Sequence, residues 1–439
     1  MCRSAPIHFA AYNSCMLCRI TLALLILALP AAGQAPPPPV TIVAVGDVAC
    51  DPADSAYNGG AGTATRCRMM ATSDLALGLQ PAAVLLLGDN QYEDGTLAKY
   101  QASYDPSWGR LKAVTKPVPG NHEYMTPGAQ GYFTYFGAAA GDPAKGYYSF
   151  DLGGWHLIAL NSNCGAVGGC GAASPQGQWL AADLAAHPGV CTLAYWHHPR
   201  FSSGPHGVDP TFGDFWNLLY EAGADVVLTG HDHGYERFAP QSPAAVADPA
   251  GIRQFVVGNG GKNLTSVTTV RANSEVRNYS AFGVLELKLY PNGYKWKFLG
   301  VNGATLDSGQ GLCHSALPSK ELDFHTVVPC RVADTRISSP LAAGVPRIFP
   351  VAGSCGIPAE AVAVAANVKA VSPSAAGHLQ VFPAGAPLSE ATVASFRANV
   401  NRSGSAILPL GVAGEVEAIS SSATHFVLDV SGYFAPSPE

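Results

Sequence analysis

The stretch GDNQY at residues 88–92 is the sequence on which our interpretation of the fold rests. It follows the apolar run AVLLL at 83–87, which is typical of a buried strand in a parallel sheet. Gly88 allows the chain to turn where the strand ends. Asp89 then stands at the carboxyl end of the strand, where open α/β sheets place their sites. Because a carboxylate has two oxygens, we expect Asp89 to bridge two metal ions, with Tyr92 turned toward one of them.

Four more fragments repeat this order of apolar strand, turn and metal-type side chain. They are VAVGD at 43–47, PGNHE at 119–123, LAYWHHP at 193–199 and VVLTGHDH at 226–233. With these five fragments the chain resembles the calcineurin-like metallophosphoesterases. Within that superfamily it is most similar to the purple acid phosphatases, which have a Tyr three residues after the bridging Asp. The resemblance covers about residues 41–312. The chain departs from the family pattern at Ala49, where the first motif usually has Gly.

The resemblance implies an α/β fold with four layers in the order αββα, in which two packed mixed sheets are flanked by helices. Apolar periodicity predicts helices at 67–79, 176–187 and 212–222, and strands at 41–46, 83–87, 191–196 and 225–229. Later strands are expected at 254–258, 282–290 and 294–299, and the aromatic, Gly-rich segment 124–146 is expected to be a surface loop. Residues 321–439 have few helical patterns and many short alternating runs, so we expect a small all-β sandwich domain there.

Length and composition agree with more than one domain. The chain has 439 residues, and a typical domain has about 100–200. We expect a catalytic domain at 41–315, preceded by a Pro-rich spacer at 34–40 (QAPPPPV) and followed by the β domain at 321–439. The net charge of -6 gives no reason to expect a nucleic-acid-binding or anionic-membrane-binding surface.

Residues 1–33 are expected to be a signal peptide. Arg3 and Arg19 precede the apolar run 20–29, and Ala31-Ala32-Gly33 offers a cleavage site of small residues. The alternative is a membrane anchor, but the run is shorter than the roughly 20 apolar residues that span a bilayer. We therefore expect a secreted, extracellular or periplasmic protein without a membrane segment after cleavage.

Eight of the 11 cysteines lie beyond residue 33, an even number that suggests disulfides in an exported protein. Proximity in sequence favours the pairs Cys50–Cys67, Cys164–Cys170 and Cys330–Cys355, which leaves Cys191–Cys313. The alternative is that some of these residues are buried free thiols. A cysteine-ligated zinc site is not expected, because no C-x-x-C pair occurs outside the signal.

The family resemblance implies a ligand set for two metal ions. One ion takes Asp47, Asp89, Tyr92 and His233, and the second takes Asp89, Asn121, His197 and His231. These oxygen and imidazole donors suit iron paired with zinc, manganese or a second iron.

Three more histidines are candidates for contacts with the substrate. His122, beside Asn121, is implied as a proton donor to the leaving alkoxide or as a phosphate contact. Neighbouring side chains at a strand end point to opposite sides, so His197 and His198 are not expected to bind one metal, and His198 becomes a candidate for contacting phosphate. His206, in the loop SSGPHG, is a further candidate, with an ordinary surface histidine as the alternative.

These expectations combine into a secreted binuclear metallophosphoesterase that hydrolyses small-molecule phosphomonoesters by attack of a metal-activated hydroxide. One alternative is a phosphodiesterase or nucleotidase on the same metal pair. Another is a surface-binding protein without catalysis, which the presence of all seven proposed ligands argues against. No ligand is assigned to the C-terminal domain.

Overall fold

The computed structural model describes residues 38–314, 322–386 and 391–436. The predicted signal peptide and residues 34–37 of the spacer lie outside this part. Val40, which we counted with the spacer, is the first residue of strand β1. Among the described residues, no helix has both the length and the apolar character needed to span a bilayer.

The first sheet has six strands in the order β13-β12-β11-β1-β2-β3. Strands β1, β2 and β3 run parallel, and β11 pairs antiparallel with β1. The strand bounds are β1 (Val40–Val45), β2 (Ala83–Leu87), β3 (Thr115–Val118), β11 (Gly283–Tyr290), β12 (Gly293–Gly300) and β13 (Thr305–Leu312).

The second sheet has seven strands in the order β10-β8-β9-β7-β6-β5-β4. Strands β5, β6, β7 and β9 are parallel neighbours, and antiparallel strands close both edges. The bounds are β4 (Tyr148–Leu152), β5 (Trp155–Ala159), β6 (Cys191–Tyr195), β7 (Val226–Thr229), β8 (Tyr235–Phe238), β9 (Arg253–Val257) and β10 (Ser274–Asn278).

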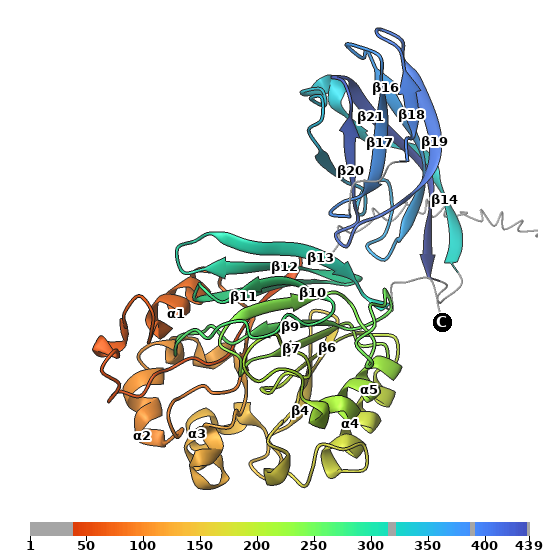
Figure 1. The fold of residues 1–439 in the computed structure, drawn as a ribbon. Coiled ribbons are helices and arrows are strands. Elements are labelled where there is room, and N and C mark those ends of the chain that lie inside the picture. Colours follow the sequence, from red (N-terminus) through yellow and green to blue (C-terminus); the bar gives the residue numbers. More distant parts are fainter. Residues whose placement is uncertain (1–37, 315–321, 387–390, 437–439) are drawn as a thin grey trace, which may run out of the picture. The chain divides into compact units, whose positions relative to one another are not determined.

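Alternate residues of the central strands point to opposite faces of their sheet. One face packs against the other sheet, and the opposite face packs against helices. Ile42 and Ala44 of β1 join Leu193 and Leu228 of the second sheet in one buried cluster, so the two sheets pack face to face. Helices α1 (Met69–Gly78), α2 (Leu97–Lys99) and α3 (Gln130–Phe136) lie on the outer side of the first sheet (Figure 1). Helices α4 (Pro175–Ala186) and α5 (Gly213–Glu221) cover the second sheet. The predicted four-layer αββα arrangement is confirmed.

The prediction of a surface loop at 124–146 was wrong. This segment contains α3, and four of its aromatic residues are buried: Tyr132, Phe133, Tyr135 and Phe136. The Tyr135 ring stacks on Tyr100 with centroids 5.0 Å apart, and the Phe136 ring packs edge-on to Tyr104. These partners come from an earlier part of the chain, so α3 is stabilised by contacts that its local sequence does not reveal.

Residues from 322 onward form an all-β sandwich of two four-stranded sheets, as predicted. Its core contains Val364, Val368, Val416 and Leu428. One sheet has the order β14-β21-β16-β19 and the other β15-β20-β17-β18. The bounds are β14 (Leu322–Asp334), β15 (Arg347–Pro350), β16 (Ala363–Val371), β17 (Gly377–Pro383), β18 (Ala394–Phe396), β19 (Arg402–Pro409), β20 (Glu415–Ser420) and β21 (His425–Pro436).

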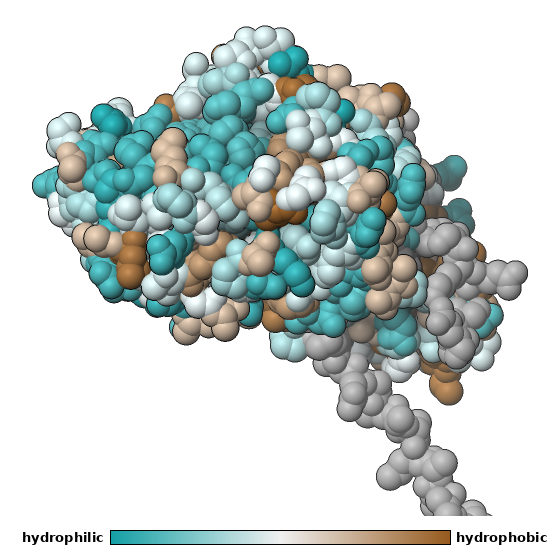
Figure 2. Space-filling model, turned by 90° about the horizontal axis from the view of Figure 1, so that it is seen from below, coloured by the Kyte–Doolittle hydropathy of each residue, from teal (hydrophilic) through white to brown (hydrophobic). Residues whose placement is uncertain are grey.

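Four disulfides join the eight cysteines from Cys50 onward. The pairs are Cys50–Cys67, Cys164–Cys170, Cys191–Cys313 and Cys330–Cys355, as predicted. The face of the molecule in Figure 2 is mostly hydrophilic, and its hydrophobic groups form small separate spots.

Candidate metal centre

The turns that follow five parallel strands bring the predicted ligands together. Asp47 follows β1, Asp89 follows β2 and Asn121 follows β3, all in the first sheet. His197 follows β6, and His231 and His233 follow β7, in the second sheet. The donors therefore meet where the carboxyl ends of both sheets lie side by side.

The backbone of these turns has an unusual conformation. Asp47, Asp89 and His231 have φ angles of 59°, 47° and 71°, values that residues other than glycine seldom adopt. Gly88 has φ of +85°, and a Cβ atom there would lie 2.6 Å from Nδ1 of His197. Such strain is concentrated at functional sites in proteins, and here it aims the carboxylates and the imidazole inward.

The first group of donors surrounds the hydroxyl of Tyr92. This oxygen lies 2.8 Å from Oδ1 of Asp47, 3.0 Å from Oδ2 of Asp89 and 3.1 Å from Nε2 of His233. Burial and the two carboxylates raise the pKa of Tyr92 well above its ordinary value. Two of these three neighbours are carboxylate oxygens, which only accept hydrogen bonds, and the single phenolic proton faces both of them.

The second group surrounds Nε2 of His197. This atom lies 3.1 Å from Oδ1 of Asn121, 3.1 Å from Nδ1 of His231 and 3.3 Å from Oδ2 of Asp89. Asp89 thus takes part in both groups, through the same buried carboxylate.

The hydrogen bonds of these side chains fit a bound cation. The carbonyl of Leu87 accepts a hydrogen bond from Nδ1 of His197 over 2.8 Å, so Nε2 of the neutral ring is an acceptor that faces acceptor oxygens. The oxygen lone pairs that face Nε2 also attract a proton to it. Burial lowers the pKa of His197, but the charge of Asp89 has the larger effect, and the pKa is raised to about 9. Among the described residues, the buried Nδ1 of His233 has no hydrogen-bond partner. Carboxylate, phenol, amide and imidazole donors together fit borderline transition metals.

Glu123 is a buried carboxylate whose role the sequence interpretation missed, although it quoted the GNHE motif. It accepts hydrogen bonds from the main-chain N–H groups of Asn90 (2.9 Å), Gln91 (3.1 Å) and Gly120 (2.7 Å). It therefore joins the turn after β2 to the turn after β3, and so fixes Asp89 relative to Asn121.

His122 lies beside the first group. Its ring centroid is 4.4 Å from that of Tyr92, and its Nε2 is 3.9 Å from Oδ2 of Asp89. Its Nδ1 is hydrogen bonded to the main-chain carbonyl of Glu93, so this nitrogen carries the proton when the ring is neutral. The side chain is 20% exposed, so a molecule in solution can reach it.

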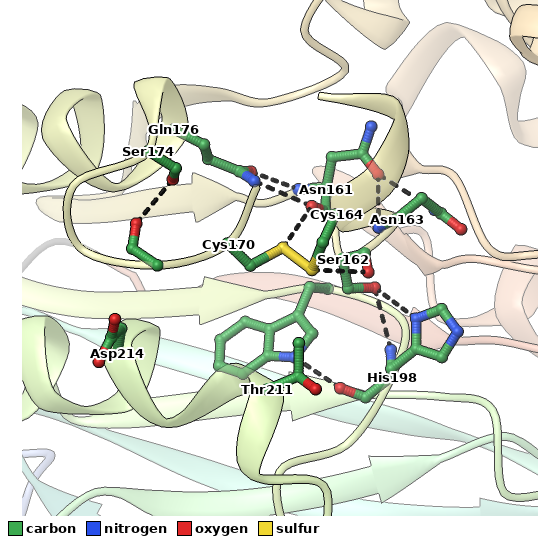
Figure 3. The surroundings of a disulfide bond; sticks show 12 residues. Asn161, Ser162, Asn163, Cys164, Cys170, Ser174, Gln176, His198, Thr211 and Asp214 are labelled. Atoms are coloured by element: carbon green, nitrogen blue, oxygen red, sulfur yellow. Dashed lines mark hydrogen bonds between the residues drawn. A yellow bond between two sulfur atoms is a disulfide. The ribbon is translucent and has the colours of Figure 1, made fainter. Parts of the chain in front are cut away.

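His198 lies near the second group but makes different contacts from His197. Its ring is 4.5 Å from that of His231, and its Nδ1 lies 2.8 Å from the hydroxyl of Ser162. Figure 3 shows this serine, two residues before the disulfide Cys164–Cys170, pointing at His198. Burial, followed by the charge of His197, lowers the pKa of His198 to about 3. His198 therefore lies at the site but outside the two donor groups.

His206 also reaches the site. Its ring is 3.8 Å from that of His231, and its side chain is 49% exposed. Its Nδ1 lies 2.7 Å from Oδ1 of Asp232, a buried residue between the two histidines of the GHDH motif. The partner Asp232 was missed from the sequence because the two residues meet only in the fold.

Comparison with known families agrees with this geometry. The family model described as calcineurin-like phosphoesterase matches residues 40–235, which include every predicted donor. This part of the chain is a calcineurin-like phosphoesterase domain.

Two relatives that are similar to the phosphoesterase domain come from a plant. Purple acid phosphatase 15 of Arabidopsis thaliana is 29% identical over 218 residues, which are 41% of this chain and 40% of that protein. Purple acid phosphatase 18 of the same plant is 32% identical over 200 residues, 41% of this chain and 44% of that protein. The chain therefore spans less than half the length of these relatives.

A solved structure has the same fold as the phosphoesterase domain. Purple acid phosphatase PPD1 from yellow lupin (Lupinus luteus) seeds aligns with a TM-score of 0.52 and 19% sequence identity. The alignment covers 64% of this chain and 55% of the lupin chain.

Proposed function

We propose that this chain is an exported, binuclear metal-dependent phosphoesterase that hydrolyses phosphomonoesters. The observation that carries the proposal is the convergence of seven donor side chains into two groups that share Asp89. Asp47, Asp89, Tyr92 and His233 would hold one metal ion, and Asp89, Asn121, His197 and His231 the other. The donor types favour iron with zinc, manganese or a second iron.

When bound, two such ions would polarise a phosphoryl oxygen and lower the pKa of water, which is the chemistry that phosphate ester hydrolysis needs. Around them, this chain supplies three histidines for the substrate. His122 stands beside Tyr92 and Asp89, where it can give a proton to the leaving alkoxide. His198 and His206 flank His231 and can donate hydrogen bonds to phosphate oxygens.

Export is part of the proposal. The four disulfides support it, because disulfides persist in oxidising compartments. The apolar run at 20–29 with its small-residue cleavage site supports it from the sequence. A secretion assay that detects a mature chain starting near residue 34 would test this part.

The function is tested by turnover of p-nitrophenyl phosphate and bis(p-nitrophenyl) phosphate by the purified chain supplied with iron, zinc or manganese. We expect faster cleavage of the monoester. Faster cleavage of the diester would replace the proposed substrate class with phosphodiesters. A folded, metal-loaded chain that turns over neither compound would contradict the proposal.

A further inference from the structure

Two arginines line a hollow next to the loop that carries His206. Arg200 and Arg271 form the hollow, which has a volume of about 290 Å³, together with Phe201, Val208 and the segment 243–245. Apart from the arginines, its walls are apolar or small side chains. Positive charge is thus concentrated on otherwise uncharged walls.

The guanidinium group of Arg200 is attracted by the charge of Asp209 only from beyond ion-pair distance. Among the described residues it makes neither a hydrogen bond nor an ion pair, and its Nε and Nη1 atoms are buried. The group packs 4.6 Å from the centre of the Phe201 ring. An unpaired buried donor costs folding free energy, so an oxyanion that accepted hydrogen bonds from Nε and Nη1 would be stabilised there.

Arg271 is held in place by bonds that leave its charge unpaired. Its Nε donates to the carbonyl of Ser202 over 3.1 Å, and its main-chain N–H donates to the hydroxyl of Ser203 over 3.0 Å. Within the described part of the chain, no carboxylate lies within ion-pair distance of it.

The hollow adjoins the candidate metal centre through one loop. A Cβ atom on Gly207 would lie 2.8 Å from Nη2 of Arg271, so this guanidinium touches the residue next to His206. The His206 ring in turn packs 3.8 Å from His231. A molecule whose phosphate lies at His231 and His206 therefore has a cationic hollow on the other side of the residue that follows His206.

We propose that Arg200 and Arg271 bind a second anionic group of the substrate. Guanidinium groups match phosphate and carboxylate oxygens in charge and geometry, and an oxyanion in the hollow would satisfy the buried donors of Arg200. The preferred substrates are then phosphomonoesters that carry a further phosphate. This inference rests on the proposed function, and it names the substrate class.

The test compares fructose 1,6-bisphosphate with fructose 6-phosphate, which differ by one phosphate on the same sugar. The metal-loaded full chain is expected to favour the bisphosphate by about tenfold in kcat/KM, mainly through KM. In Arg200→Ala and Arg271→Ala this ratio is expected to fall toward one. The matched control is Arg402→Ala, an exposed arginine of β19, which should keep the wild-type ratio. A wild-type ratio near one, or unchanged ratios in both arginine variants, would overturn the proposal.

A second measurement separates this inference from the proposed function. Phenylglyoxal modifies free arginines, and peptide mass spectrometry can measure the modification at each arginine of the full chain without any turnover. Fructose 1,6-bisphosphate is expected to protect Arg200 and Arg271 but not Arg402, and fructose 6-phosphate should protect them less. If this protection occurs in a chain that hydrolyses no phosphate ester, the anion site stands and the proposed function fails. If activity is present without protection, the function stands and the anion site fails.

Discussion

Asp232 orients His206 by accepting two hydrogen bonds from that residue, at 2.7 Å from the ring Nδ1 and at 3.2 Å from the main-chain N–H. The other carboxylate oxygen of Asp232 accepts from the hydroxyl of Ser202. An ionised carboxylate only accepts hydrogen bonds, so Nδ1 of His206 carries a proton and Nε2 remains available for another partner. The exposed histidine is thus held in one orientation by a fully buried acid.

If Asp232 acts through His206, the two residues must be coupled in activity. We expect Asp232→Ala to lower kcat/KM for p-nitrophenyl phosphate by about an order of magnitude, and to cause no further loss in a His206→Ala background. The measurement is a double-mutant cycle, with metal content determined for each variant because Asp232 lies between His231 and His233. Additive losses would assign Asp232 a structural role only.

Asp89 is the one carboxylate shared by both donor groups. We expect Asp89→Asn to lose bound metal and activity together, because an amide has a single acceptor oxygen and no charge. Metal content by atomic emission and turnover would be measured on the same sample. Asp142→Asn, at an exposed carboxylate, is the matched control. Full activity in Asp89→Asn would refute the bridging role.

His122 is expected to affect turnover without affecting metal binding. For His122→Ala we predict retained metal and a loss of about 10²-fold or more in kcat for alkyl phosphates, whose leaving groups need a proton. The loss should be smaller for p-nitrophenyl phosphate, whose leaving group is a weak base. Equal losses on both substrates would exclude a proton-donor role.

The disulfides should differ in their contribution to stability according to the length of chain they close. Cys164 and Cys170 are separated by 6 residues in sequence, and Cys191 and Cys313 by 122. Replacing both cysteines of a pair by serine is expected to lower the free energy of unfolding by about 2 kcal/mol for the short loop and about 5 kcal/mol for the long one. Urea denaturation of the two variants tests the order; the reverse order would indicate residual structure in the unfolded chain.

Asp307 gives the fold a predicted dependence on pH. Burial opposes ionisation of this aspartate, but hydrogen bonds from Arg237 (2.7 Å) and Tyr235 (2.6 Å) hold its pKa below the ordinary value. A lowered pKa in the folded state stabilises the fold above about pH 4, and this stabilisation is lost as the pH falls through the folded-state pKa. Asp307→Asn should therefore be less stable than the wild type at pH 7, and the difference should shrink at pH 3. A difference that grows at low pH in urea titrations would contradict this assignment.

The convergence of the candidate donors could be predicted from the sequence because each follows a short apolar strand. Asp47, Asp89 and His197 each stand two residues beyond the end of β1, β2 and β6, so the pattern of strand and turn was enough to place them together. It predicted poorly where contacts come from distant segments. Helix α3 was missed because its aromatic residues are stabilised by Tyr100 and Tyr104. Strand β13 was missed because its run TLDSGQGL has little apolar character.

The partners of the candidate substrate contacts were missed for the same reason. Ser162 and Asp232 are ordinary polar residues in the sequence, and they gain a role only when His198 and His206 fold against them. Arg200 and Arg271 lie far apart along the chain and gave no local signal of a shared hollow.

The atom that sets the protonation of His197 belongs to the main chain of Leu87, the last residue of a buried strand. Every amino acid has this carbonyl, so no side-chain replacement at position 87 can delete it. A saturation mutagenesis screen would therefore find position 197 intolerant, whereas position 87 would accept apolar residues of similar size. The carbonyl oxygen of Leu87 thus determines that Nε2 of His197 faces the centre without a proton on the neutral ring, and substitution leaves this oxygen in place. A survey of side chains alone would overlook this hydrogen bond.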